Sequence, residues 1–337
     1  MINKHFTIPI FVPELACPFQ CIYCNQRKIS GQLRIPEEQE IKDTIEKYLQ
    51  TIPKGNSFIE IGFFGGNFTG IAPKIQENFL KIVQPYVHSG KIKGIRLSTR
   101  PDYINEKNLD FLKKYGVNTI ELGAQSLDNE VLQKSFRGHS FEQVQEASNL
   151  IIKKGFSLGL QMMLGLPGDT KEKALFTANK IVELGADNTR IYPCLVIKGT
   201  ELEHIYNKGE YQPLSMEQAV DWAKEVLLIF EKNNVNILRV GLHPSEGLMN
   251  GEDLIAGPYH VSFKEFVLSS IWHDIIMKTI DKNVYGDNIS INVPVKEINY
   301  AIGYKSVNRN WLLQRFNNVR FYPDNNLKGR NCIISNE

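Results

Sequence analysis

Short apolar runs rich in β-branched and aromatic residues alternate along the chain with stretches in which apolar residues recur every three or four positions. The runs predict seven strands, at Phe6–Val12, Phe58–Phe64, Gly94–Ser98, Thr119–Gly123, Leu158–Leu164, Thr189–Val196 and Ile237–Leu242. The periodic stretches predict six helices, at Glu37–Gln50, Pro73–Val87, Glu106–Tyr115, Phe141–Lys154, Lys171–Leu184 and Met216–Lys232. Strand and helix in this repeated order indicate right-handed parallel βαβ units with the helices outside the sheet.

Six such units and a further strand are more than an open doubly wound sheet usually holds. They predict an α/β fold, a partial or complete (β/α) TIM-like barrel of parallel strands with a C-terminal α/β extension. We expect the barrel over residues 1–235, with a cysteine loop at 17–24. Residues 236–337 are then the last barrel strand, a glycine-rich, lid-like loop at Gly247–Pro258 and the extension. Functional groups of such barrels lie on loops after the strands.

The composition is that of a globular protein, with 42% hydrophobic and 23% charged residues. Lys and Arg number 39 against 37 Asp and Glu, so the net charge of +2 gives no overall positive field for nucleic-acid binding. No apolar run reaches the ~18 residues that cross a bilayer, so we expect no membrane association. The apolar stretch Ile8–Val12 is short and contains Pro9. It does not match a targeting segment, which predicts a cytoplasmic protein.

The first loop of the predicted barrel carries Cys17, Cys21 and Cys24 in a C-x3-C-x2-C pattern. Thiolates are soft ligands, and three on one loop can each bind an iron of a four-iron cluster. The other two cysteines, Cys194 and Cys332, lie far along the chain. One iron would then stay open, which favours chemistry over electron transfer.

Two other interpretations of the cysteines stay open. A zinc-bearing module without catalysis would need a fourth ligand close by. An iron–sulfur electron carrier or redox sensor normally saturates its cluster with four ligands. Neither interpretation finds that fourth ligand near the cysteine loop.

Further motifs follow the cysteines in order, and over Cys17 to Tyr211 the sequence resembles the radical S-adenosylmethionine (radical SAM) superfamily. Tyr23, before the last cysteine of the loop, belongs to that pattern. The radical domain of the Elongator catalytic subunit resembles "FRGHS" (Phe136–Ser140), "MMLGLPG" (Met162–Gly168) and "RIYPCLVIKGTELEHIYNKGEY" (Arg190–Tyr211). Oxygen-independent coproporphyrinogen oxidase is similar in "LGAQSLD" (Leu122–Asp128). No acyl-CoA-binding glycine loop follows, so we expect no acetyltransferase domain.

The resemblance implies a [4Fe-4S] cluster and S-adenosylmethionine as cofactors, with Cys17, Cys21 and Cys24 as the cluster ligands. It implies reductive cleavage of S-adenosylmethionine to a 5′-deoxyadenosyl radical, which abstracts hydrogen from an unidentified substrate. An electron donor such as flavodoxin or ferredoxin is then a partner. The protein supplies binding, orientation and exclusion of water.

The resemblance also implies a set of S-adenosylmethionine contacts, namely Tyr23 against the adenine, Gly65, Gly66, Asn67, Ser98, Gln125, Arg137 and Gln161. The two glycines would let backbone carbonyls approach the methionine ammonium. Gln125 and Arg137 match the polar pair that holds the ribose and the carboxylate. Each residue has a structural alternative, such as a tight turn for the glycines, a helix cap for Gln125 and a surface ion pair for Arg137.

Three residues are candidates for contact with substrate or for proton transfer. His243 and Lys198 follow predicted strands, and His260 follows the glycine-rich loop. A helix cap or a structural hydrogen bond is the alternative for each.

Residues 299–330 combine basic side chains with aromatic ones, namely Lys305, Arg309, Arg315, Arg320, Lys328 and Arg330 with Tyr300, Tyr304, Trp311, Phe316, Phe321 and Tyr322. Basic groups neutralise phosphates and aromatic rings stack on unpaired bases, so an RNA-modifying enzyme is the alternative function. The favoured interpretation is an amphipathic helix with Ser306 as N-cap. Val307, Trp311, Leu312 and Phe316 share the apolar face of that helix.

Overall fold

The computed structural model describes residues 4–12, 21–25, 28, 34–53, 55 and 57–337. The chain divides into two compact units. The first comprises residues 1–215 and 226–259, and the second comprises 216–225 and 260–337. The last strand of the large sheet and the glycine-rich segment therefore group with the first unit.

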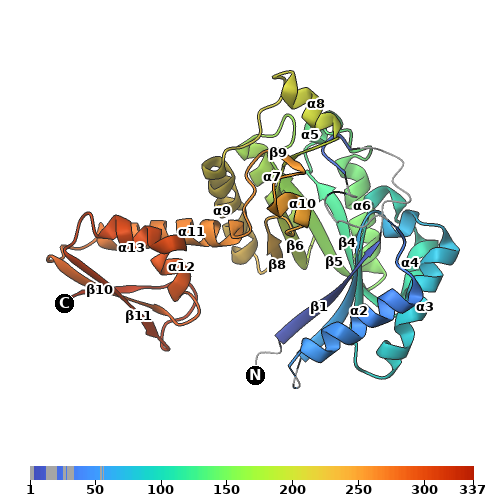
Figure 1. Ribbon diagram of the computed structural model, residues 1–337, viewed down its shortest axis with the longest axis horizontal. Coiled ribbons are helices and arrows are strands. Elements are labelled where there is room, and N and C mark those ends of the chain that lie inside the picture. Colours follow the sequence, from blue (N-terminus) through green and yellow to red (C-terminus); the bar gives the residue numbers. More distant parts are fainter. Residues whose placement is uncertain (1–3, 13–20, 26–27, 29–33, 54, 56) are drawn as a thin grey trace. The chain divides into compact units, whose positions relative to one another are not determined.

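The first unit is built on a seven-stranded sheet in the order β1-β2-β3-β4-β5-β6-β8 (Figure 1). The strands are β1 (Lys4–Val12), β2 (Ser57–Gly65), β3 (Gly94–Thr99), β4 (Val117–Gln125), β5 (Ser157–Leu164), β6 (Asn188–Pro193) and β8 (Asn236–Val240). Every neighbouring pair is parallel. Among the described residues β1 and β8 do not pair, so the sheet is a curled half-barrel. The partial-barrel prediction is confirmed.

Helices connect the strands at the predicted places. They are α2 (Glu38–Thr51), α3 (Pro73–His88), α4 (Glu106–Lys114), α5 (Asn129–Lys134), α6 (Phe141–Lys153), α7 (Lys171–Glu183), α8 (Glu201–Asn207) and α9 (Met216–Lys232). Side-chain capping sets where such a helix starts. At α7, for example, the side chain of Thr170 accepts a hydrogen bond from Lys173 N. The faces that pack inward repeat every three or four residues, as in Val144, Ala147 and Ile151 of α6.

The sequence prediction was wrong around the sixth strand and the glycine-rich segment. β6 ends at Pro193, which lacks the backbone N–H that a continuing strand needs. A separate strand β7 (Val196–Ile197) pairs antiparallel with β9 (Leu254–Ala256). The segment expected as a loop thus contains β9 and overlaps the short helix α10 (Glu246–Met249). Apolar residues of this region pack together, namely Leu195, Ile197 and Leu248.

The second unit contains a three-stranded sheet and three helices, which confirms an α/β extension. The elements are α11 (Phe263–Ile280), β10 (Asn288–Pro294), α12 (Ile298–Ile302), α13 (Val307–Leu312), β11 (Asn318–Asp324) and β12 (Ile333–Asn336). β10 is central, parallel to β11 and antiparallel to β12. Its inward side chains Ile289, Ile291 and Val293 are fully buried with Trp272 of α11.

The predicted helix around residue 311 is only partly right. Ser306 stands at the N-cap position as predicted, but its backbone is left-handed (φ 62°) and its side chain makes no capping hydrogen bond. Val307 is 52% exposed, so it does not share the buried face. Trp311, Leu312 and Phe316 belong to the core of the second unit. In the described part of the chain, no helix has the length and apolarity that a membrane span requires.

Candidate active site

The described part of the cysteine loop is anchored on three sides. Cys17 lies outside the described residues, whereas Cys21 is buried and Cys24 is half-buried. Ile22 donates its N–H to Ser135 O at 3.3 Å, and its carbonyl accepts from Leu202 N at 2.7 Å. Apolar neighbours of its described residues come from five other elements and turns, namely Val131, Leu166, Cys194, Leu202 and Tyr211. The described part of the loop is therefore fixed to several segments of the first unit.

Arg137 faces one of the cysteines. Its Nη1 donates to Cys21 Sγ at 3.2 Å and its Nη2 to Gly123 O at 2.5 Å. Burial opposes the charge of Arg137, but Tyr23 and Cys21 beside it raise the pKa of the guanidinium above its ordinary value. The guanidinium thus fixes one sulfur of the cysteine loop, and cysteine sulfurs are the ligands that hold iron–sulfur clusters. The donor set therefore fits a metal-binding loop.

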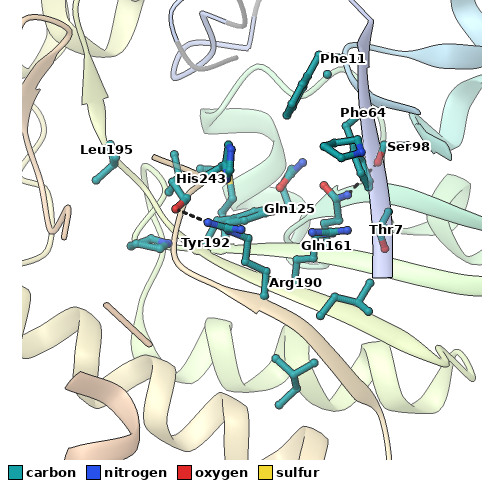
Figure 2. Close-up of a pocket in the computed structure, with 18 of the residues that line it drawn as sticks. Thr7, Phe11, Phe64, Ser98, Gln125, Gln161, Arg190, Tyr192, Leu195 and His243 are labelled. Carbon is teal, nitrogen blue, oxygen red and sulfur yellow. Dashed lines mark hydrogen bonds between the residues drawn. The ribbon is translucent and has the colours of Figure 1, made fainter. Parts of the chain in front are cut away.

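A cavity of about 700 Å³ lies within the first unit, lined by strands from both sides of the half-barrel (Figure 2). The cofactor side, which we define by the cysteine loop and strands β2 to β5, contributes Tyr23, Cys24, Phe64, Gly65, Ser98, Gln125, Gln161 and Met163. The β6–β8 side, which we define by β6, β7, β8 and the residues after them, contributes Arg190, Tyr192, Pro193, Leu195, Ile197, Asn236, Ile237, Leu238, Arg239, Leu242 and His243. Its size is that of a site for a small organic molecule.

The structure brings seven of the predicted site residues together around this cavity, namely Tyr23, Cys24, Gly65, Ser98, Gln125, Gln161 and His243. Five other predicted residues in the described part do not line it. They are Gly66, Asn67, Arg137, Lys198 and His260. Cys21 does not line the cavity either, although its neighbours Tyr23 and Cys24 do. Gly66 donates its N–H to Val12 O at 3.2 Å.

Gly65 and Gln125 have backbone conformations that suit close approach to a ligand. Gly65 has φ 112°, and a Cβ there would lie 2.2 Å from Val12 O. Gln125 has φ 67° beside a register shift between β4 and β5. Its side-chain Oε1 is buried and has no hydrogen-bond partner among the described residues. An unpaired buried acceptor costs ~1–3 kcal/mol, which a hydroxyl donor of a bound nucleoside would recover. This acceptor fits S-adenosylmethionine.

Asn67, Ser98 and Gln161 are engaged with protein groups. The side-chain Oδ1 of buried Asn67 accepts from Thr99 Oγ1 at 2.6 Å and from Arg100 N at 3.3 Å. Gln161 Nε2 lies 3.3 Å from Ser98 Oγ and donates to Glu121 at 3.0 Å. Asn67 thus fixes the end of β3, whereas Ser98 and Gln161 present their remaining surface to the cavity.

A chain of alternating charges runs through the interior of the half-barrel and was missed from the sequence. Arg96 bonds to Glu60 through Nε and to Glu121 through Nη1, the latter at 2.7 Å. Arg190 Nε donates to Glu121 Oε2 at 2.6 Å. Burial alone would raise the pKa of Glu121, but Arg190 and Arg96 lower it, so the carboxylate is charged. In the sequence, each of these side chains is the one charged residue of its strand, and this is the signal that could have revealed the chain of charges.

The three candidates for the substrate side lie in different surroundings. The ring of His243 stacks on Phe11 at 6.2 Å, and burial followed by Arg239 lowers its pKa. Lys198 is exposed, and its backbone N–H donates to Asp253 O at 2.9 Å. His260 belongs to the second unit, where its ring contacts Phe266 at 4.6 Å and its Nδ1 accepts from Ser262 N at 2.9 Å. The alternative stated for these residues, a structural hydrogen bond, therefore accounts for His260.

Comparison with known proteins identifies the superfamily of the chain. The chain matches the model of the radical SAM superfamily over residues 14–181 and that of the radical SAM C-terminal domain over 186–272. It belongs to the radical SAM superfamily, whose members are enzymes. Membership implies an iron–sulfur cluster and the use of S-adenosylmethionine.

Within the superfamily, the chain is similar to proteins of the Elongator type. It is 31% identical to a tRNA uridine(34) acetyltransferase of Methanocaldococcus infernus, over 65% of this chain and 49% of that protein. It is 32% identical to an uncharacterised protein of Methanocaldococcus jannaschii, over 65% of this chain and 70% of that one. The solved archaeal Elp3 of M. infernus has the same fold, with a TM-score of 0.66 at 23% identity over 80% of this chain and 63% of that one. The chain therefore spans about half the length of the acetyltransferase relative.

Proposed function

We propose that the protein cleaves S-adenosylmethionine reductively at a [4Fe-4S] cluster bound by Cys17, Cys21 and Cys24. The observation that carries this proposal is that Tyr23 and Cys24 line the same cavity as Gly65 and Gln125. When bound, the cluster and S-adenosylmethionine supply a carbon radical that takes a hydrogen atom from a C–H bond of the substrate. The substrate then occupies the remainder of the cavity.

Each residue of the chain has a separate task in this scheme. Arg137 donates a hydrogen bond to Cys21 Sγ at 3.2 Å and so orients this sulfur. Gly65 lets the Val12 carbonyl of β1 come close to β2 where both strands end beside the cavity. Gln125 offers its unpaired oxygen to a hydroxyl group. An electron enters from a partner, for which a flavodoxin or ferredoxin is the proposed class.

Anaerobic purification and reconstitution with iron and sulfide test the proposal. After reduction with dithionite, S-adenosylmethionine should yield 5′-deoxyadenosine, measured by liquid chromatography and mass spectrometry. Cys24→Ala should abolish the yield, whereas Cys332→Ala should leave it unchanged, because Cys332 lies in the second unit beside Thr279. A cluster with four protein ligands and no 5′-deoxyadenosine would instead establish an electron carrier or redox sensor. Zinc in place of iron would establish the non-catalytic module.

Modification of transfer RNA is the second candidate, and the observation that favours it is the similarity to the tRNA uridine(34) acetyltransferase. Several aromatic side chains of residues 299–330 are engaged in packing within the second unit. Tyr300, Trp311, Phe316 and Phe321 pack in the core of the second unit, whereas Tyr322 is 40% exposed. Unfractionated tRNA added to the reaction should raise the yield of 5′-deoxyadenosine. An unchanged yield, with no new nucleoside mass, would contradict this candidate.

A further inference from the structure

The β6–β8 side of the cavity differs in charge from the rest of the half-barrel. Among the described residues that line the cavity, none is an aspartate or a glutamate. Four basic residues do line it, namely His5, Arg190, Arg239 and His243. Three of these four lie on the β6–β8 side. This wall therefore presents positive charge and hydrogen-bond donors to whatever enters.

Arg239 of β8 is the cation that lacks a compensating charge. Its Nε donates to Gly241 O at 3.0 Å and its Nη2 to Leu242 O at 3.1 Å. Both partners are neutral carbonyls, and no carboxylate of the described residues pairs with Arg239. Burial, together with the neighbouring Arg190, lowers the pKa of Arg239, while Tyr192 opposes that change. The third nitrogen, Nη1, has no hydrogen-bond partner among the described residues.

The charge balance of the interior confirms that Arg239 is in excess. Glu60 and Glu121 neutralise Arg96 and Arg190 within the chain of alternating charges. Glu121 already binds two guanidinium groups, so it has no capacity left for a third. Arg190 nonetheless reaches the cavity, where its guanidinium lies over the Phe64 ring at 4.9 Å. Arg239 is half-buried, and a partly desolvated cation without a compensating charge is stabilised when a ligand supplies the anion.

Two neutral donors accompany the cations on this wall. Figure 2 shows Tyr192 and His243 on the same side of the cavity as Leu195, with Arg190 beside them. Burial raises the pKa of Tyr192, so its hydroxyl keeps its proton. The lowered pKa of His243 leaves its imidazole neutral at pH 7, with one N–H to donate. Planar guanidinium and these donors suit the oxygens of phosphate or carboxylate.

We propose that Arg239, with Arg190, Tyr192 and His243, forms an oxyanion subsite for a phosphate or carboxylate group of the substrate. That the bound group belongs to the substrate rests on the proposed function, whereas the binding of an anion to this wall does not. The cysteine loop, Gly65 and Gln125 line the cofactor side, so the subsite lies on the wall left for the second reactant. The group fixes the substrate so that its reacting carbon faces the cofactor side.

Thermal unfolding of the whole protein, without cofactors, tests the subsite. Inorganic phosphate and acetate are titrated separately, with sodium chloride holding the ionic strength constant. A ligand that binds the folded state raises the melting temperature with its concentration. We expect one of the two anions to do so in the wild type, and the one that does identifies the chemistry. Arg239→Gln should weaken that response about tenfold or more, the effect of losing a charged hydrogen bond.

Two further variants keep the result interpretable. Arg315→Gln in the second unit changes the same charge at a half-exposed position, and its response should equal that of the wild type. Tyr192→Phe keeps the ring and removes one donor, so it should weaken the response even if Arg239→Gln melts too early to be measured. Equal responses in all four proteins, or no response to either anion, would overturn the subsite. Failure of the proposed function has a different signature, the absence of 5′-deoxyadenosine from the wild type, and leaves these melting curves unaffected.

Discussion

The guanidinium of Arg137 donates to Cys21 Sγ over 3.2 Å, and so joins two residues that are 116 positions apart. The same side chain is tied to the carbonyl of Gly123 in β4. The cysteine loop is thereby fastened to the fourth strand through one buried cation. Arg137 therefore does more than balance charge, because the direction of its hydrogen bond orients the sulfur of Cys21.

Replacement of Arg137 by Gln should therefore weaken metal binding. Residues that orient a ligand typically change metal affinity by about 10- to 100-fold. We expect iron to leave Arg137→Gln correspondingly faster when the reconstituted protein is challenged with a chelator under anaerobic conditions, as followed by absorbance. Arg315→Gln is the matched control and should retain iron like the wild type. Equal iron loss in both variants would show that Arg137 does not support the cysteine loop.

Removal of the Glu121 carboxylate should strongly destabilise the fold. Glu121 is almost fully buried between Arg96 and Arg190, so Glu121→Gln leaves Arg190 without its anion and Arg96 with Glu60 alone. Loss of one partner from a buried ion pair costs about 3–5 kcal/mol of unfolding free energy. Urea denaturation at neutral pH measures the loss.

Glu130→Gln is the control for this experiment. Glu130 contacts Lys134 and Lys173 but is more than half exposed, so water screens both pairs. Its effect on the unfolding free energy should be much smaller. A comparable loss in the two variants would contradict the stabilising role of the chain of charges.

The sheet and the cysteine loop could be predicted from sequence because both depend on local pattern. Apolar runs place each strand of the seven-stranded sheet close to its observed bounds, and three cysteines on one loop indicate their chemistry by spacing alone. The break after Pro193 could not be predicted as readily. The apolar run continues to Val196, and only the pairing of β7 with β9 shows that it has left the sheet.

Apart from His243, the β6–β8 side of the cavity was missed for a related reason. Arg190 and Tyr192 occupy alternate positions of β6 and so share one face of the sheet. In sequence they look like polar interruptions of a strand, and only the parallel pairing of β6 with β8 shows that Arg190 lies beside Arg239. His260 shows the opposite case. It follows the glycine-rich segment in sequence, yet it packs against Phe266 and Tyr304 of the second unit.

Asp169 should make stability depend on pH. Burial raises its pKa to about 7, although Gly165 N donates to its Oδ2 at 2.9 Å. Its ordinary pKa is 3.8. As the pH rises above that value, the unfolded chain loses this proton while the folded protein still keeps it. The free energy of unfolding therefore falls as pH rises to about 7, by about 2 kcal/mol between pH 5 and pH 8.

Asp169→Asn isolates this contribution, because the amide oxygen can still accept from Gly165 N but does not titrate. Urea denaturation at pH 5 and pH 8 gives the pH dependence of each protein. The wild type should lose more stability than the variant as the pH rises. A difference of zero, or one of opposite sign, would show that Asp169 is ionised in the folded protein.

Gly65 should tolerate no side chain, since its φ of 112° is unfavourable for other residues and an added Cβ would lie 2.2 Å from the Val12 carbonyl. Gly65→Ala is therefore expected to lose at least ~3 kcal/mol of unfolding free energy, from backbone strain and from displacement of β1. It should also bind S-adenosylmethionine more weakly in equilibrium dialysis, because Gly65 lines the cavity. Gly90→Ala separates the two causes: Gly90 has φ 72° and open space around it, so it incurs only the backbone cost of about 1–2 kcal/mol and leaves binding unchanged. Equal stability and equal binding in the two variants would mean that the close contact between β2 and Val12 does not shape the site.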